Sequence, residues 1–339
     1  MVRKKYWVDL FILPFFFILL LNFQLVDYGL MQLFGQLKLI YQSVPVQEVL
    51  VDPAVSSSVK TKLQFIQDVE RYGVDSLGLK PTNNYRSYYD QKGKPLLWVV
   101  TASQPFDLVP YTWSFPFLGE VSYKGYFLKD RAEHLSEELR LAGFDVYAYD
   151  VSAWSTLGWL PDPILSGMLA RDEGRLAELI LHELTHASVY LKSDVDYNEN
   201  LASFVGEQGA IRYLKYRFGK NSSIYLSYVQ RLADDKQLTR HLVRGADALR
   251  VLYASDVFKK SRDLKPLYKQ HMFDSIVSCL DTVRFYDPSR VSRAIKGHSW
   301  NNANFLSYLR YDAQKDSLEQ IMILKDSCDL RRFIARISH

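Results

Sequence analysis

Two histidines and a glutamate occur at a spacing that can hold and use a metal ion. His182, Glu183 and His186 form the motif HELTH. In a helix, side chains four residues apart project from the same side, so both imidazoles could reach one ion. Imidazole is a common ligand of Zn²⁺, and a neighbouring carboxylate can take a proton from water. The motif therefore predicts one Zn²⁺ per chain, with Glu183 as the catalytic carboxylate.

The segment that carries the motif has the pattern of a buried helix. Residues 175–191 read RLAELILHELTHASVYL, and their apolar positions recur at helical spacing. A structural interpretation competes with the metal site. In that interpretation the histidines satisfy hydrogen bonds inside a core, and Glu183 pairs with a neighbouring arginine.

A catalytic zinc site needs a third protein ligand and an open position for water. Residues 198–216, NENLASFVGEQGAIRYLKY, predict the next helix. Glu199 is the predicted third ligand, because the short preceding loop returns the start of this helix to the histidines. Glu207 lies on nearly the same face of this helix as Glu199. It is the alternative, either as the third ligand itself or as a residue that hydrogen-bonds to a ligand. Asn198 is a further candidate for that supporting role.

The elements that must position this site divide the chain into a sheet-rich part, at about 95–155, and a helical part, at about 172–335. Stretches rich in β-branched and aromatic residues predict strands at 95–102, 120–128 and 145–151. We therefore expect strands to dominate before residue 155. The predicted fold class is α+β, with a small N-terminal sheet region followed by a mainly helical catalytic body.

Helices are also expected before and between these strands. Residues 28–50 predict a helix that ends near Pro45 and packs on the main domain. Residues 56–72 predict an amphipathic helix with serine as its cap. Residues 129–142 predict a further helix that ends at Gly143.

Residues 1–27 predict a membrane anchor or a signal segment, and 28–339 a zinc metallopeptidase domain. Three basic residues at positions 3 to 5 precede an uncharged stretch, residues 10–26. As a helix this stretch would be about 25 Å long, slightly short for a bilayer core. The lack of a small-residue cleavage pattern favours a retained anchor over a cleaved signal peptide. The terminal position, the basic flank and the aromatic residues favour membrane insertion over a buried core helix. Either form of export would place the domain outside the cytoplasm.

Composition excludes one class of partner and one kind of metal site. The 42 basic and 38 acidic residues are spread along the chain and give a net charge of +4, so no surface for nucleic acid is indicated. The only two cysteines, Cys279 and Cys328, exclude a cysteine-rich metal site. They could form one disulfide or remain as two buried thiols.

Several longer motifs accompany the histidine pair. They are TWSFPFLGEVSYKGYF at 112–127, VSAWSTLGWLPDPIL at 151–165, LHELTHASVYLKSDVDYNENLASFVGEQGA at 181–210 and WNNANFLSYLRY at 300–311. With these motifs the chain resembles the predicted bacterial aminopeptidases of the gluzincin type, from about residue 28 to 311. In gluzincins the segment matching Asn198, Glu199 and Ala202 completes the zinc site, so the resemblance implies Glu199 as ligand. Ser114 and Glu120 stand where the family commonly has cysteines, and its lipid-attachment cysteine is missing.

Two further features bear on the substrate. Residues Ser155, Thr156, Leu157 and Gly158 could form an edge strand that pairs with a bound peptide, although a tight turn fits them equally well. Tyr308, Tyr311 or His298 could donate a hydrogen bond to the transition state. An aminopeptidase also needs an acidic group for the substrate amine, and the sequence assigns neither Glu120 nor Glu207 to it.

The leading hypothesis is therefore a zinc-dependent peptidase, an aminopeptidase by resemblance, held in the inner membrane of a bacterial envelope or exported. Its expected partners are a peptide substrate and the membrane. An alternative is a catalytically silent envelope protein that binds peptides or another partner with the same fold. Another is a hydrolase of a non-peptide amide that uses the same site residues.

Overall fold

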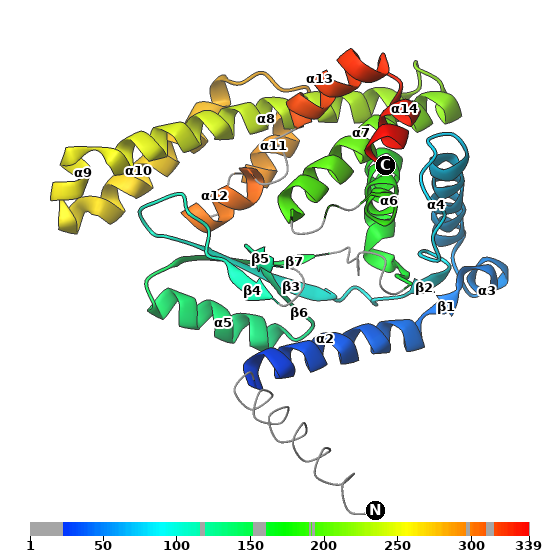
Figure 1. Ribbon diagram of the computed structural model, residues 1–339, viewed down its shortest axis with the longest axis horizontal. Coiled ribbons are helices and arrows are strands. Elements are labelled where there is room, and N and C mark those ends of the chain that lie inside the picture. Colours follow the sequence, from blue (N-terminus) through cyan, green and yellow to red (C-terminus); the bar gives the residue numbers. More distant parts are fainter. Residues whose placement is uncertain are drawn as a thin grey trace, which may run out of the picture.

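The computed structural model describes residues 23–115, 119–151, 161–189, 191, 194–295, 299–309 and 315–338. A three-stranded antiparallel sheet lies at its centre (Figure 1). Strand β3 (Leu97–Ser103) pairs on one edge with β6 (Lys124–Tyr126) and on the other with β7 (Asp145–Val151). Helices α5 (Lys129–Leu141) and α12 (Asn302–Leu309) lie on opposite sides of this sheet, so most of β3 is buried.

Two smaller sheets complete the strands. The first joins β1 (Val44–Pro45), β2 (Ser87–Tyr89) and β8 (Ile164–Leu165), and the second is the hairpin of β4 (Trp113–Phe115) and β5 (Gly119–Val121). The described residues are otherwise mostly helical, which confirms the α+β class.

The helical part packs around two neighbouring helices, α6 (Glu173–Ser188) and α7 (Val195–Phe218), with α4 (Ser57–Asp75) against α6. The long helix α8 (Ser223–Ala254) follows (Figure 1). The remaining helices are α2 (Phe23–Gln42), α3 (Val46–Val51), α9 (Asp256–Lys260), α10 (Lys265–Ser278), α11 (Pro288–Ile295), α13 (Lys315–Asp326) and α14 (Leu330–Ile337), with short 3₁₀ turns η1 (Ser166–Ala170), η2 (Arg262–Leu264) and η3 (Cys279–Thr282).

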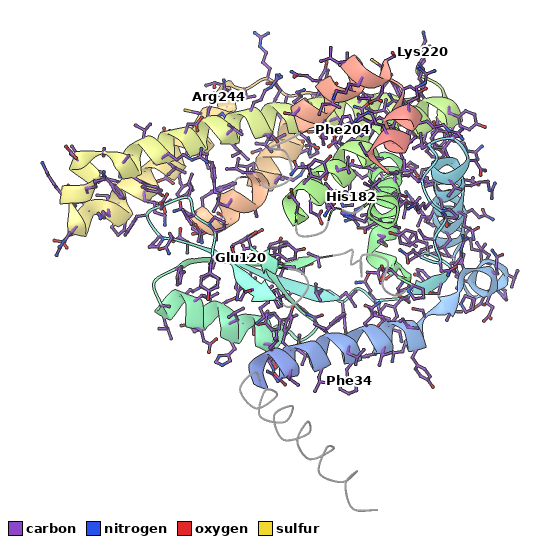
Figure 2. The ribbon with its side chains drawn as sticks, in the orientation of Figure 1. Phe34, Glu120, His182, Phe204, Lys220 and Arg244 are labelled. Carbon is purple, nitrogen blue, oxygen red and sulfur yellow. The ribbon has the colours of Figure 1, made fainter. Side chains whose placement is uncertain are left out.

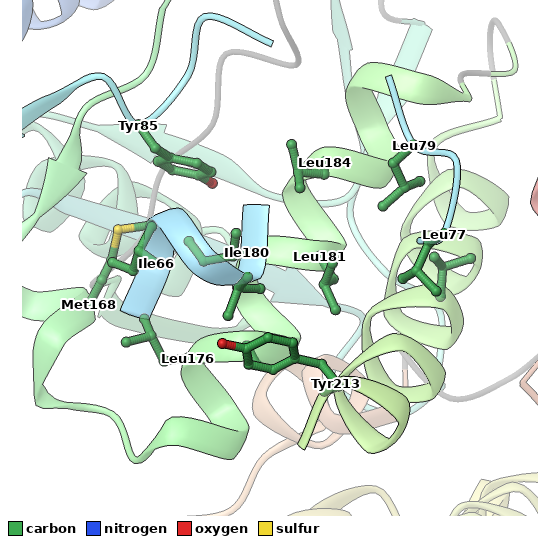
Figure 3. Packing of buried hydrophobic residues seen from close by; sticks show 14 of the residues in the cluster. Ile66, Leu77, Leu79, Tyr85, Met168, Leu176, Ile180, Leu181, Leu184 and Tyr213 are labelled. Carbon is green, nitrogen blue, oxygen red and sulfur yellow. The ribbon is translucent and has the colours of Figure 1, made fainter. Parts of the chain in front are cut away.

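The largest core fixes α6 in place. Ile66 from α4 and Tyr213 from α7 pack with the apolar side of α6, where Leu176, Ile180 and Leu181 are fully buried (Figure 3). A helix with one side so completely covered cannot rotate without exposing that side to water, so its other side is held in a fixed direction. That other side carries the histidine motif.

Several predicted elements are confirmed, including β7 and the helices α4 and α5. Ser56 caps α4, because its hydroxyl accepts a hydrogen bond from the backbone N–H of Val59. Helix α5 ends before Gly143, whose φ of +87° lies in the left-handed region that glycine adopts without strain.

Two sequence predictions are wrong. Residues 120–128 do not form one strand, because β5 pairs with β4 while β6 pairs with β3. Helices occupy more of the chain before residue 155 than strands do, since α2, α3, α4 and α5 all lie there.

The helix predicted to end near Pro45 is α2, which ends at Gln42. Pro45 itself lies in β1, and the rest of the predicted stretch forms the separate helix α3.

The cysteines differ from both sequence interpretations. Cys279 and Cys328 are separate thiols, and both are exposed rather than buried.

The predicted membrane anchor falls mainly on residues 1–22, outside the described residues. From Phe23 onward, no helix in the described ranges is long and apolar enough to cross a bilayer.

Candidate metal centre

The N-cap of helix α6 fixes where the helix begins, and its apolar side fixes its rotation. The carboxylate of Asp172 accepts a hydrogen bond of 2.9 Å from the backbone N–H of Arg175, which satisfies one of the free donors at the helix start. The buried apolar side then fixes the rotation of the helix. As predicted, His182 and His186 lie one turn apart, with their ring centroids 4.8 Å from each other.

The turn between α6 and α7 is closed by Asn198. Its side-chain oxygen accepts a hydrogen bond of 2.8 Å from the backbone N–H of Leu191, and its amide donates one of 2.7 Å to the carbonyl of the same residue. Asp194 caps α7 by accepting from the N–H of Tyr197. These contacts bring the first turn of α7, and Glu199 with it, back to the histidines.

Two glycines allow α7 to pack unusually close to α6. A methyl group at Gly206 would lie 2.8 Å from the backbone oxygen of Glu178 and 3.2 Å from the backbone nitrogen of His182. One at Gly209 would lie 2.8 Å from the side chain of Leu181. Because Gly206 faces the backbone itself, any larger residue there would separate the helix that carries Glu199 from the helix that carries the histidines.

Three donor groups meet at the site. The Nε2 atoms of His182 and His186 are 3.1 Å apart. Glu199 Oε2 lies 3.5 Å from His182 Nε2, and Glu199 Oε1 lies 3.6 Å from His186 Nε2. Donors at the corners of a tetrahedron about 2.0–2.1 Å from its centre are about 3.4 Å apart, so these separations fit one four-coordinate ion.

The donor set and its burial also fit a catalytic ion. One ligand atom from each of His182, His186 and Glu199 lies within 4.8 Å of the others, the only such group among the described residues. Two histidines and one glutamate are a known ligand set of catalytic zinc. The side chain of His186 is only 3% exposed, whereas His182 and Glu199 keep 18% and 16%. The accessible side of the site is therefore next to His182.

Burial and neighbouring charges separate the pKa values of the two imidazoles. Burial, and then the charge of His182, lower the pKa of His186 to about 4, although Glu199 opposes this shift. Burial alone would also lower the pKa of His182, but its hydrogen bond to Glu199 and the charges of Glu183 and Glu199 raise it above its usual value. At neutral pH the imidazole of His186 is therefore uncharged and can offer a lone pair to an ion, whereas the raised pKa of His182 makes its proton harder to displace.

A serine orients the first imidazole. Ser203 Oγ lies 3.5 Å from His182 Nδ1, one turn of α7 beyond Glu199. When Nε2 of His182 serves as the ligand, Nδ1 carries the hydrogen and donates it to this hydroxyl, which fixes the tautomer and the ring plane. His186 Nδ1 is buried and has no hydrogen-bond partner in the part of the chain that the structure describes.

A cleft of about 570 Å³ opens beside His182 and Glu183. Its other lining residues are Ala170, Arg171, Asp172, Arg175, Glu178, Leu179 and Arg231. His182 and Glu183 therefore border the same solvent-accessible space. Figure 2 shows His182 in the interior of the molecule, between the helical part and the sheet.

Ion pairs fix the side chains of Arg175 and Glu178, which line this cleft. One guanidinium nitrogen of Arg175 donates to both carboxylate oxygens of Glu178 at 2.9 Å, and the other donates to Asp235 at 2.6 Å. The hydroxyl of Tyr228 donates to Glu178 at 3.0 Å. Burial would lower the pKa of Arg175, but Glu178 and Asp235 raise it. Arg175 therefore stays charged beside Glu178, which lies one turn before His182.

A buried phenol lies close to Glu183. Tyr85 is only 2% exposed, and burial, followed by the negative charge of Glu183, raises its pKa well above the usual value. Tyr85 is therefore a neutral phenol at neutral pH.

The remaining predicted residues are placed as follows. Glu207 lies on α7. Burial, the charge of Glu178 and, to a smaller extent, the charge of Glu207 raise the pKa of Tyr228. Tyr308 lies on α12, where its ring packs on Trp300 and its hydroxyl is 3.5 Å from the carbonyl of Ala294. The possible substrate strand (Ser155, Thr156, Leu157 and Gly158), Tyr311 and His298 lie outside the described residues, so their roles stay predictions.

Sequence reasoning missed Ser203, Gly206 and the pair of Arg175 and Glu178. A signal for each was present. Ser203 and Gly206 follow Glu199 by four and seven residues, which places all three on one side of α7. Glu178 precedes His182 by four residues on α6. Residues one turn from a predicted ligand were therefore the positions to examine.

Comparison with known proteins gives the family. A family model described as "Putative aminopeptidase" matches residues 27–339, and the chain belongs to this family. This membership indicates peptidase activity. No curated protein and no solved structure matches the chain.

Proposed function

We propose that the protein is a zinc-dependent aminopeptidase of the gluzincin type. His182, His186 and Glu199 hold one Zn²⁺, and Glu183 is the general base. The observation that carries this proposal is the set of donor separations, 3.1, 3.5 and 3.6 Å, which fits a tetrahedral ion beside an open cleft. Family membership supports a peptide substrate and the release of amino-terminal residues.

Each residue has a defined task in hydrolysis. A Zn²⁺ held by these ligands would act as a Lewis acid toward a peptide carbonyl and make water reactive at neutral pH. Glu183 accepts the proton of the attacking water and then donates it to the leaving amine, for which its place beside His182 in the cleft is suitable. Ser203 holds the ring of His182, and Asn198 holds the turn that presents Glu199.

We also propose that the protein works at the bacterial cell envelope, outside the cytoplasm. The sequence supports this location, since basic residues at positions 3 to 5 precede the uncharged stretch at 10–26. A peptide is the proposed substrate and the membrane the proposed attachment.

The test measures metal content and hydrolysis on the same preparations. Purified full-length protein in detergent is assayed by elemental mass spectrometry and by release of a fluorophore from aminoacyl substrates. We expect about one zinc per chain in the wild type. We expect Glu183→Gln to retain that zinc but to lose about 10²- to 10⁴-fold in turnover, because only the proton transfer is removed.

Two controls complete the test. His186→Ala should lose both zinc and activity. Glu173→Gln, a change of the same type at the start of α6, where the half-buried Glu173 pairs with Lys62 away from the histidines, should keep both. Hydrolysis that is undiminished in Glu183→Gln would refute the mechanism, and zinc without hydrolysis of any peptide would favour the silent binding protein.

A further inference from the structure

Helix α2 carries a row of exposed apolar side chains along its outer side. Their exposed fractions are 48% for Leu30, 48% for Leu33, 65% for Phe34, 48% for Leu37 and 91% for Tyr41. Leu30, Phe34 and Leu37 are three or four residues apart, Leu33 lies beside Phe34, and Tyr41 follows Leu37 by four residues, so the five side chains form one continuous stripe. Figure 2 shows Phe34 on the side of α2 that faces away from the sheet. We call these five residues the α2 stripe.

The opposite side of α2 is fixed to the domain. Tyr28 Oη and Gln32 Nε2 donate to the carbonyl of Gly125 at 3.0 and 2.6 Å. Leu39 is buried, and Gly35 lies directly against the ring of Phe127, which leaves no room for a larger side chain. The stripe therefore cannot turn inward to be covered by the domain, and it needs a partner outside it.

The charges beside the stripe suit an anionic surface. Asp27, the only carboxylate of α2, accepts from Arg131 at 2.6 Å and is thereby compensated. Lys38, the only basic residue of α2, is exposed on the flank of the stripe, four residues after Phe34. A lysine at the edge of an apolar surface can extend its charged end toward lipid phosphate while its stem stays in apolar contact.

The order of the chain indicates which apolar partner is present. Residues 10–26 contain no charged side chain, and this stretch runs directly into α2, which begins at Phe23. A stretch of this composition prefers a lipid environment. The α2 stripe begins at Leu30, only four residues after the uncharged stretch ends. A lipid bilayer that holds this stretch is therefore the apolar environment nearest to the stripe.

The size of the stripe argues against a second copy of the chain. Residues 30–41 rise about 16 Å along one helix, and a strip one helix wide offers far less than the roughly 800 Å² per partner that a stable dimer buries. A lipid surface needs no such minimum area, because an amphipathic helix binds it through apolar side chains and adjacent positive charge.

We propose that the α2 stripe lies in the interface of an anionic lipid bilayer and fixes the orientation of the domain on the membrane. The apolar side chains enter the boundary between headgroups and acyl chains, and Lys38 contacts the phosphates. The domain then stands on the membrane through the side opposite the helical part, as the position of α2 in Figure 1 indicates. This proposal does not depend on zinc or on catalysis.

The test uses a fluorescent probe at one position of the full-length chain. The exposed thiols are first removed by Cys279→Ser and Cys328→Ser. An environment-sensitive probe is then attached to Phe34→Cys, and the protein is reconstituted in vesicles of phosphatidylethanolamine and phosphatidylglycerol that carry brominated acyl chains. The matched control is Val251→Cys, an apolar position of comparable exposure, 72% against 65% for Phe34, on the distant helix α8.

We expect brominated lipid to quench the probe at position 34 about threefold or more strongly than the probe at position 251, because only the former enters the acyl boundary. Leu37→Cys should behave like Phe34→Cys. Circular dichroism confirms that each labelled protein is folded. Equal, weak quenching at both positions would overturn the proposal. Self-quenching between probes at position 34 that is unchanged by the lipid would also overturn it, in favour of a second copy as the partner.

Discussion

Replacing Gly206 by alanine tests whether the close packing of α6 and α7 sets the geometry of the metal site. The added methyl group would lie 2.8 Å from the backbone oxygen of Glu178, whereas ordinary van der Waals contact begins at 3.4 Å. Backbone atoms in the middle of a helix cannot move aside singly. The two helices must therefore separate by about 0.6 Å at this point.

This displacement is large for a metal site and modest for stability. Ligand positions must hold to within about 0.2 Å, and Glu199 lies on the same side of α7 as Gly206, two turns earlier. We expect the affinity for zinc to fall about 10- to 100-fold, the range found when groups that hydrogen-bond to metal ligands and orient them are lost. Overpacking costs about 1–3 kcal/mol, and removal of a helical glycine returns about 1 kcal/mol, so the net loss of stability is about 0–2 kcal/mol.

The matched control is Gly209→Ala, three residues further along α7. There the new methyl group would also lie 2.8 Å from an atom of α6, but that atom is the end of the flexible side chain of Leu181. Affinity is measured by competition with a chromogenic chelator, and thermal unfolding is measured on the metal-free proteins. A Gly206→Ala variant that folds and binds zinc within about twofold of the wild type would refute the reasoning, since the expected loss is at least tenfold.

Three further predictions concern the ligands and the C-terminal helices. Ser203→Ala removes the acceptor at His182 Nδ1 and should weaken zinc binding about tenfold in the same competition, with little change in the unfolding temperature of the metal-free protein. Removal of zinc by chelation should lower the unfolding temperature of the wild type but not of His186→Ala in calorimetry, because an ion at a thousand times its dissociation constant stabilises the folded state by about 4 kcal/mol. Hydrogen bonds from Arg336 hold the pKa of Asp326 in the folded protein below its usual 3.8. The stability that this pair contributes is therefore complete above pH 3.8 and is lost as the pH falls through the lower pKa of the folded state. The difference in free energy of unfolding between wild type and Asp326→Asn should therefore shrink on acidification below pH 3.8 in denaturant titrations, and a difference that grew would contradict this.

Features that depend on neighbours in the chain could be predicted. The helix that carries His182 and His186 follows from the spacing of its apolar residues, and the cap at Ser56 and the end at Gly143 follow from local backbone chemistry. Glu199 could be chosen over Glu207 because a short loop limits how far the next helix can travel. In each case the deciding contacts lie within about a dozen residues.

Features that depend on distant pairing could not be predicted. The composition of residues 120–128 favours extended backbone, but only the contacts with β4 and β3 divide it into β5 and β6. The apolar residues of α2 carry no mark that separates Leu39, which is buried, from Phe34, which is exposed. A helix has a known apolar content from sequence alone, whereas the side that is covered depends on what packs against it.

The sequence by itself determined the type of chemistry: a pair of histidines on one turn of a helix, a carboxylate beside them, and a third ligand within reach. Only the tertiary structure decided whether those groups could act together. It set the 3.1 Å separation of the imidazole nitrogens, the approach of α7 at Gly206, and the cleft beside Glu183. The physical reason is that residue types and local spacing are written along the chain, while distances of a few tenths of an ångström arise from close packing between helices.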